Sequence, residues 1–269
     1  MSESSPREVT VTSWAELQDE LFAGSWQPGI GRYRSTYAFR GLADREWSLA
    51  TSLSRLGGDY ARLERHLVRN FRKYAYLESG ENTSLWNLLA LAQHHGLPTR
   101  LLDWTYSPYV ALHFVTDDVA MADHDGAIWC IDYTETNRLL PEDLLAALRS
   151  EEADAFSTEM LDGVAGTLDS LAELSAEPFL MFFEPPSLGP RIVNQFALFS
   201  VLSTAVTTLG DWLADHPKIY RRIIIPRELK WEVRDKLDQA NVNERVLFPG
   251  LDGLCRWLGR QYSPRPSVE

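Results

Sequence analysis

The chain has 269 residues, of which 45% are hydrophobic and 24% are charged, as in a globular protein of one large domain or two small ones. It contains no apolar run long enough to cross a membrane, no segment typical of a secretory signal, and only two cysteines, Cys130 and Cys255. We therefore expect a cytoplasmic protein that makes no use of a membrane and has no disulfide framework.

The net charge of −12 is unevenly distributed along the chain. Residues 30–110 carry a net charge of +4 and residues 191–269 one of +3, whereas residues 111–190 carry −15. The acidic segment, residues 117–184, predicts either a solvated surface or a face for a basic partner. A protein that binds nucleic acid over its whole surface is normally basic, but the two basic ends leave room for a local basic groove.

Capping residues and apolar periodicity predict the elements of the first half of the chain. Ser13 and Glu16 form a capping box, so a helix begins near Ser13. A strand is predicted at 37–40 and ends at Gly41. Apolar residues recur at helical spacing over 59–77 and 84–94, and Gly96 ends the second of these helices. Ser107 is the predicted N-cap of a helix that runs to about Ala120.

The second half of the chain mixes strands and helices without regular alternation. Strands are predicted at 126–133, 179–183, 191–202 and 220–225, an acidic helical region at 135–177, and helices at 228–240 and 251–260. This pattern predicts an α+β fold in which helices surround a small, mixed, mostly antiparallel sheet. The predicted organisation is a helical lead-in (1–34), one domain (35–262) with an insert-like region at 135–190, and a tail (263–269).

The common catalytic and nucleotide-binding motifs are absent from the sequence. It contains no GxGxxG or P-loop pattern in the right context and no HExxH, GxSxG or CxxC. His94 and His95 are adjacent, so on a helix they point in different directions and are poor joint ligands for a metal. We therefore predict no metal site.

Three polar clusters remain as candidates for a site. Arg40 ends a strand before Gly41, which would let a ligand approach the backbone, unless Arg40 is paired with a buried carboxylate such as Asp103. The second cluster is the stretch 93–114, in which polar residues surround Trp104; a polar joint between two helices is the alternative. The third cluster is a predicted strand over 191–200, which would place Arg191 and Gln195 on one face. The alternative is that this strand is a sheet edge with a polar face.

Together these clusters resemble the FRG domain family. The resemblance rests on Phe39-Arg40-Gly41, on the block 93–114, on Arg191, Asn194, Gln195 and Phe199, and on the stretch 247–254, and so spans most of the chain. Gly250 departs from the pattern, which has an acidic residue there. Membership implies an intracellular bacterial or phage-borne protein in a defence or toxin setting.

The order of these motifs also resembles, more distantly, ADP-ribosyltransferases. Several of those families carry an early strand with Arg-Gly or His-Gly, a later strand–Ser/Thr–helix unit, and a final strand with Glu or Gln. Here Arg40-Gly41, Thr105 with Ser107, and Gln195 come in the same order. The resemblance implies an NAD-dependent transferase, with NAD as substrate, that modifies an unidentified protein or nucleic acid.

This resemblance implies a role for each candidate residue. Arg40 would hold phosphate or ribose of NAD, Thr105 or Ser107 would orient the nicotinamide ribose, and Trp104 or Tyr109 would stack on nicotinamide. Gln195 replaces the usual carboxylate, so Asp103, Glu184 or Glu244 would have to supply the negative charge. The further site candidates are His95, Arg100 and Arg191. The alternative is a non-catalytic module that binds a nucleotide, nucleic acid or protein.

Overall fold

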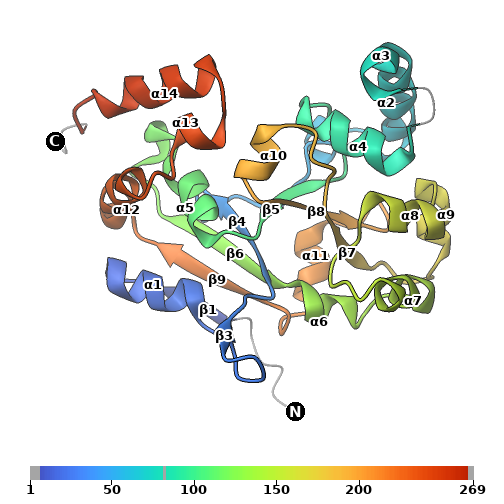
Figure 1. Cartoon of the computed structure of the whole chain (residues 1–269), viewed down its shortest axis with the longest axis horizontal. Helices are drawn as coiled ribbons and strands as arrows, with labels where there is room; N and C mark the ends of the chain where they lie inside the picture. Colours follow the sequence, from blue (N-terminus) through green and yellow to red (C-terminus); the bar gives the residue numbers. More distant parts are fainter. Residues whose placement is uncertain (1–6, 81–82, 266–269) are drawn as a thin grey trace.

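A seven-stranded sheet forms the centre of the computed structural model, which describes residues 7–80 and 83–265 (Figure 1). The strands of this sheet are β1 (Arg7–Thr10), β4 (Tyr37–Leu42), β5 (Leu102–Thr105), β6 (Gly126–Asp132), β7 (Leu180–Phe183), β8 (Ala197–Leu202) and β9 (Tyr220–Ile225). Their order is β1-β9-β6-β4-β5-β8-β7, and only β1 and β9 pair in parallel. A separate antiparallel pair is formed by β2 (Trp26–Gln27) and β3 (Arg32–Tyr33). The predicted α+β fold with a mostly antiparallel sheet is confirmed.

Helices surround this sheet. In chain order they are α1 (Trp14–Phe22), η1 (Ser54–Leu56), α2 (Tyr60–Tyr74), α3 (Tyr76–Ser79), α4 (Leu85–His94), α5 (Pro108–Thr116), η2 (Val119–Met121), α6 (Tyr133–Asn137), α7 (Glu142–Ser150), α8 (Thr158–Val164), α9 (Leu168–Glu173), α10 (Pro190–Asn194), α11 (Leu209–Ala214), α12 (Arg227–Gln239), α13 (Glu244–Leu247) and α14 (Leu251–Gln261). None of the helices in the described ranges is long and apolar enough to span a membrane.

Two groups of helices bury apolar residues against one face of the sheet. Around Phe39 of β4, the helices α1, α5 and α12 contribute residues such as Ala111 and Val233 to one cluster. Around Phe199 of β8, the helices α4, α7, α8 and α9 pack in a second cluster that includes Trp86. α11 covers the opposite face through a third cluster. The helices of the acidic segment thus have buried inner sides.

Several predicted elements differ from the observed ones. The strand predicted over 191–202 is a short helix, α10, followed by β8, because Pro190 occupies the first turn of α10 and favours a helix start. The helix that begins at Pro108 ends at Thr116, before Ala120, and the helix predicted over 59–77 is interrupted after Tyr74.

The two ends of the chain add detail to the predicted organisation. The segment 1–34 contains a helix that begins after Ser13, as predicted, but it also contributes β1 to the main sheet. Residues 1–6 of this segment, and 266–269 of the predicted tail, lie outside the described residues.

Candidate functional site

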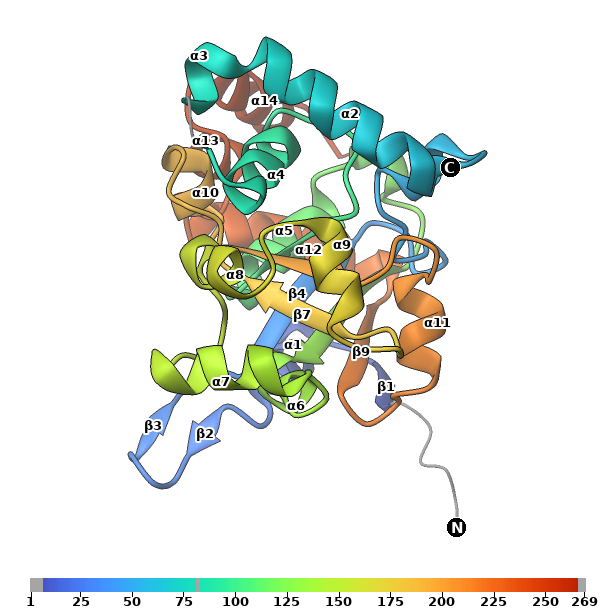
Figure 2. The same ribbon diagram turned by 90° about the vertical axis from the view of Figure 1, so that its right-hand side faces the viewer.

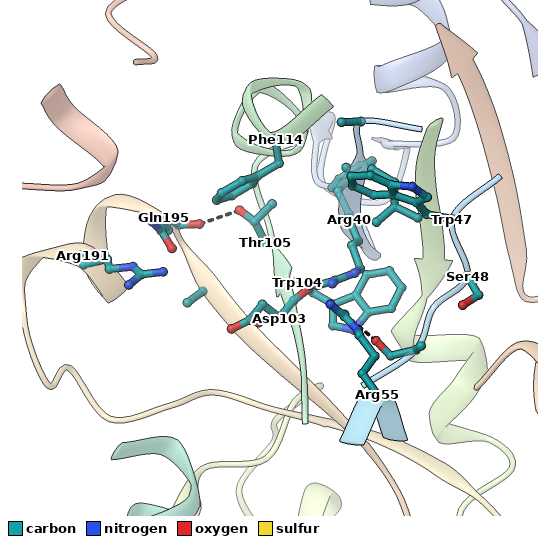
Figure 3. Close-up of a pocket in the computed structure, with 16 residues that line it drawn as sticks. Arg40, Trp47, Ser48, Arg55, Asp103, Trp104, Thr105, Phe114, Arg191 and Gln195 are labelled. Carbon is teal, nitrogen blue, oxygen red and sulfur yellow. Dashed lines mark hydrogen bonds between the residues drawn. The ribbon is translucent and has the colours of Figure 1, made fainter. Parts of the chain in front are cut away.

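A cavity of about 610 Å³ opens where β4 and β5 separate. These strands pair at one position only, Phe39 with Thr105. From there β4 continues beside β6, and β5 continues beside β8. The lining residues are Phe39, Arg40, Gly41, Leu42, Ala43, Trp47, Ser48, Ala50, Arg55, Asp103, Trp104, Thr105, Phe114, Arg191, Gln195 and Ala197 (Figure 3). The cavity volume is in the range typical of small-molecule sites.

Arg40 reaches into the gap between the two strands. Its Nη1 donates to the main-chain oxygen of Asp103 at 2.5 Å, and its buried Nε has no partner among the described residues. Burial lowers the pKa of Arg40, and the nearby negative charge of Asp103 opposes this effect. An arginine stays protonated in spite of such a shift. The expected alternative, an ion pair between Arg40 and a buried carboxylate, is therefore not what the structure contains.

Asp103 supplies the carboxylate of the cavity. It is the one acidic residue among the described residues that line this space. Its Oδ2 accepts from Gln93 Nε2 at 2.7 Å, and Gln93 Oε1 in turn accepts from Thr99 Oγ1 at 2.6 Å. This network fixes the segment that enters β5 and orients the carboxylate. The polar residues of the segment 93–105 thus form both a structural joint and one wall of the cavity.

Thr105 lies on the same face of β5 as Asp103 and meets Gln195 at the cavity. Thr105 Oγ1 donates to the main-chain oxygen of Gln195 at 2.6 Å and accepts from the Ser107 amide at 3.0 Å. Gln195 Nε2 donates to the main-chain oxygen of Leu247 at 3.0 Å. Arg40, Thr105 and Gln195 therefore line one cavity, although the Thr105 hydroxyl is already hydrogen-bonded and one of the two Nε2 hydrogens of Gln195 is used within the protein.

Two more arginines give the cavity an excess of positive charge. Arg55 donates to the main-chain oxygen of Ala50 at 2.8 Å, and Arg191 lies over the ring of Phe248 at 5.0 Å. In the described part of the chain neither of them, nor Arg40, forms an ion pair with a carboxylate. Figure 3 shows Arg191 and Arg55 on opposite sides of Asp103. Three cations around one carboxylate favour an anionic ligand.

Gly41 lines the cavity but is required for packing. A Cβ atom built on Gly41 would lie 1.9 Å from the main-chain oxygen of Ala111 in α5. The glycine therefore lets α5 approach β4, which positions Phe114 at the cavity. Gly41 is thus needed for this contact between a strand and a helix, and ligand approach to its backbone stays a prediction.

Three residues predicted to touch the cofactor have other roles. Trp104 borders the cavity, but its ring packs against Phe182 and its Nε1 donates to Ser200 Oγ at 2.8 Å, so these two contacts hold the ring; stacking on nicotinamide stays a prediction. Ser107 caps α5, as predicted, but does not line the cavity. The hydroxyl of Tyr109 donates to Gln18 of α1, away from the cavity. Strand alternation explains Trp104, because its neighbours Asp103 and Thr105 occupy the cavity face.

Four of the five remaining candidates lie outside the cavity lining. His95 is exposed at the end of α4. Arg100 forms a buried ion pair with Glu64 of α2. Glu184 accepts from the Tyr106 hydroxyl at 2.9 Å, and Glu244 is bonded to Arg260. Among these candidates Arg191 alone lines the cavity, and it does so from a helix, although a strand was predicted there.

His94 and His95, the adjacent histidines, lie at the C-terminal end of α4. Within residues 7–80 and 83–265, no three His, Cys, Asp or Glu side chains come together as metal ligands. His94 and His95 contact each other edge to face, with ring centroids 5.2 Å apart. Burial, followed by the charge of Arg191, lowers the pKa of His94.

Nine lining residues were not predicted as site residues, and they include Trp47, Ser48, Arg55 and Phe114. Trp47, Ser48 and Arg55 lie in the connection between β4 and α2, where no periodicity marks their orientation. The available signal was Trp47 itself, a large aromatic residue between Glu46 and Ser48, and the exposed fraction of Trp47 is 46%. An exposed tryptophan in a loop at a cavity is typical of a ligand contact.

The fold and the cavity define an α+β protein with an arginine-rich pocket in its central sheet. Residues 35–124 match the model of the FRG domain, which extends from the start of β4 to just beyond η2 and includes Arg40, Arg55, Asp103 and Thr105. The chain therefore contains an FRG domain. Arg191 and Gln195 lie outside the matched residues. No curated protein and no solved structure gives a significant match to the chain.

Proposed function

We propose that the cavity binds NAD and that the protein is an ADP-ribosyltransferase-like effector that modifies a macromolecular target. The observation that carries this proposal is the charge arrangement: Arg40, Arg55 and Arg191 lack carboxylate partners among the described residues and surround Asp103. A pyrophosphate satisfies such arginines better than water does, because guanidinium groups bind phosphate oxygens in pairs. The rings of Trp47 and Phe114 offer apolar surfaces for the bases.

The proposed reaction transfers ADP-ribose. The bond between the ribose C1′ and the nicotinamide nitrogen breaks, and its electron pair leaves with nicotinamide. A nucleophile on the target then bonds to C1′ and releases a proton. Asp103 provides the negative charge that stabilises the positively charged ribosyl group, and Gln195 Oε1 accepts from a ribose hydroxyl. The proposal assigns the charge to Asp103 because Glu184 and Glu244 do not line the cavity.

The second candidate is a module that binds a nucleotide without catalysis. It is favoured by the hydrogen bonds that Thr105 Oγ1 and Gln195 Nε2 already make within the protein. These bonds leave few polar groups free to stabilise the charge that develops on a reacting substrate. In this case the arginines would still bind the phosphates, but no bond would break.

The test measures binding and transfer separately. Purified protein is titrated with NAD by calorimetry, and then incubated with NAD labelled in the adenylate phosphate and with cell lysate. Arg40→Ala should weaken NAD binding about 10- to 100-fold, because a hydrogen bond to a charged group contributes about 1.5–3 kcal/mol. Arg149→Ala is the matched control, since Arg149 is exposed, lies on α7 and forms its ion pair with Glu142.

The outcomes separate the two candidates. Labelled macromolecules that depend on Arg40 support the transferase. NAD binding without label transfer under any condition favours the binding module. If Arg40→Ala binds NAD as the wild type does, or if the wild type does not bind NAD, the proposal for this cavity is rejected.

A further inference from the structure

Helix α2 carries one continuous basic face. At about 100° per residue, Arg62, Arg65, His66, Arg69, Arg72 and Lys73 all fall within an arc of about 120°. All six are exposed. The acidic residue of the helix, Glu64, lies on the opposite face, where it is buried and bonded to Arg100. The basic residues of α2 thus lie on its solvent-facing side, and its acidic residue lies on the side that faces the core.

The basic face is largely free of intramolecular partners. Arg65 pairs with Asp169 of α9, but both side chains are mostly exposed, at 73% and 61%. An exposed pair of this kind contributes little free energy and is easily exchanged. Arg62, Arg69, Arg72 and Lys73 form no ion pair within the described part of the chain. This face exists in a protein whose net charge is −12, so it is a local feature and not a consequence of overall composition.

We propose that the basic face of α2 binds the phosphate backbone of a nucleic acid. From Arg62 to Lys73 the face extends about 16 Å, at about 1.5 Å per residue. Phosphates of one duplex strand follow one another at about 3.4 Å along the axis, so the face spans about five of them. The five cations of the face, Arg62, Arg65, Arg69, Arg72 and Lys73, match this number of phosphates.

An anionic membrane is a poorer fit for this face. Helices that bind membrane surfaces insert their apolar side between lipids. In α2 that side faces the protein, where Val68 packs against the cluster around Trp86 and Leu89. Figure 2 shows α2 running along the edge of the molecule with α4 beneath it. Two apolar residues of α2, Leu63 and Tyr74, are exposed at 43% and 78%, but both lie outside the arc of the basic face, so the face itself offers charge and no apolar surface.

The test measures anisotropy of a labelled 20-base-pair duplex, and of single strands of DNA and RNA, over a range of salt concentrations. With five phosphate contacts, raising the salt from 50 to 200 mM should weaken duplex binding about 500-fold. The variant Arg62→Gln/Arg69→Gln/Arg72→Gln keeps two cations, so the same change in salt should weaken its binding only about 12-fold. At 50 mM salt this variant should bind more weakly than the wild type.

A charge-matched variant provides the control. Arg138→Gln/Arg149→Gln/Arg227→Gln lowers the net charge from −12 to −15, by three as the α2 variant does, and changes exposed residues on other helices and loops. It should retain wild-type binding. Arg62→Lys/Arg69→Lys/Arg72→Lys should also bind, because the charge remains. Thermal unfolding checks that each variant is folded.

Three results would overturn the proposal. They are equal losses in the α2 variant and the charge-matched variant, duplex and single-strand binding that does not depend on salt, and binding to phosphatidylserine vesicles without binding to any nucleic acid. The experiment contains no NAD and leaves Arg40 in place. Its outcome is therefore independent of the proposed transferase.

Discussion

Arg40 donates to the main-chain oxygen of Asp103 and not to its carboxylate, which is held by Gln93. The two charges of the cavity thus lie close together without neutralising each other through a shared hydrogen bond. Each keeps hydrogen-bonding capacity for a ligand: Arg40 through its guanidinium, and Asp103 through Oδ1. This separation lets one site bind an anion and also offer a carboxylate.

Asp103→Asn tests the role of the carboxylate. The amide oxygen can still accept from Gln93, so the fold should be kept, and NAD binding should change less than about threefold. Transfer of labelled ADP-ribose should fall about 100-fold, because loss of one electrostatic stabiliser of a transition state costs about that much. Asp143→Asn, an exposed change on α7, is the control. Transfer at the wild-type rate would remove Asp103 from the mechanism.

Gly41→Ala tests the contact between β4 and α5. The new methyl group would meet the main-chain oxygen of Ala111, which cannot rotate away. The free energy of unfolding in urea should fall by about 1–3 kcal/mol, as for other overpacked cores. Gly163→Ala, in α8, meets no atom within 4 Å and should stabilise the protein by about 0.5–1 kcal/mol. Similar effects of the two substitutions would contradict this account of Gly41.

Glu64→Gln tests the ion pair that anchors α2. Glu64 is 1% exposed and accepts from Arg100 Nε at 2.8 and 2.9 Å. Removing the negative charge leaves the Arg100 cation poorly compensated, so the free energy of unfolding should fall by about 3–5 kcal/mol. Glu142→Gln, in the exposed pair with Arg149, should cost less than about 1 kcal/mol. Equal costs would show that burial adds nothing to the Glu64–Arg100 pair.

The joint between α5 and α12 predicts lower stability in acid. Burial, followed by the charge of Arg234, lowers the pKa of His113 to about 3. Below about pH 6.5 His113 therefore becomes protonated in the unfolded chain but stays neutral in the folded protein. The free energy of unfolding decreases as the pH falls from there toward 3. Glu244 acts in the same direction: burial alone would raise its pKa, but hydrogen bonds from Arg260 lower it to about 2. Asp117, whose pKa burial raises to about 6, partly offsets the loss.

Urea denaturation at several pH values measures this effect. Between pH 7.5 and 5.5, His113 should lower the free energy of unfolding by about 1.4 kcal/mol. His113→Asn keeps an acceptor for Arg234 Nη1 but does not titrate, so its stability should change less over this interval. His66→Asn, which changes an exposed histidine of α2, should behave as the wild type does. An unchanged pH dependence in His113→Asn would assign the acid sensitivity to other groups.

Local signals in the sequence predicted much of the fold. The Ser13 cap, the Ser107-Pro108 helix start and the strand that ends at Gly41 depend on neighbouring residues, and all three occur in the structure. The strand predicted through Arg191 did not occur. The short apolar run at this position is compatible with either a strand or a helix, and Pro190 in the first turn favours the helix. β1 was missed because its pairing partner, β9, lies more than 200 residues away.

The sequence by itself determined the fold class, the starts of α1 and α5, and the set of polar residues from which most of the site is drawn. The tertiary structure alone decided which of them face the cavity. Trp104 turns into the core while its neighbours Asp103 and Thr105 line the cavity, and Arg100 pairs with Glu64 while Arg40 has no carboxylate partner among the described residues. Side-chain direction and ion pairing depend on strands and helices that are distant in the chain. Local propensity encodes an element, but the packing of those elements decides which charges are neutralised and which remain for a ligand.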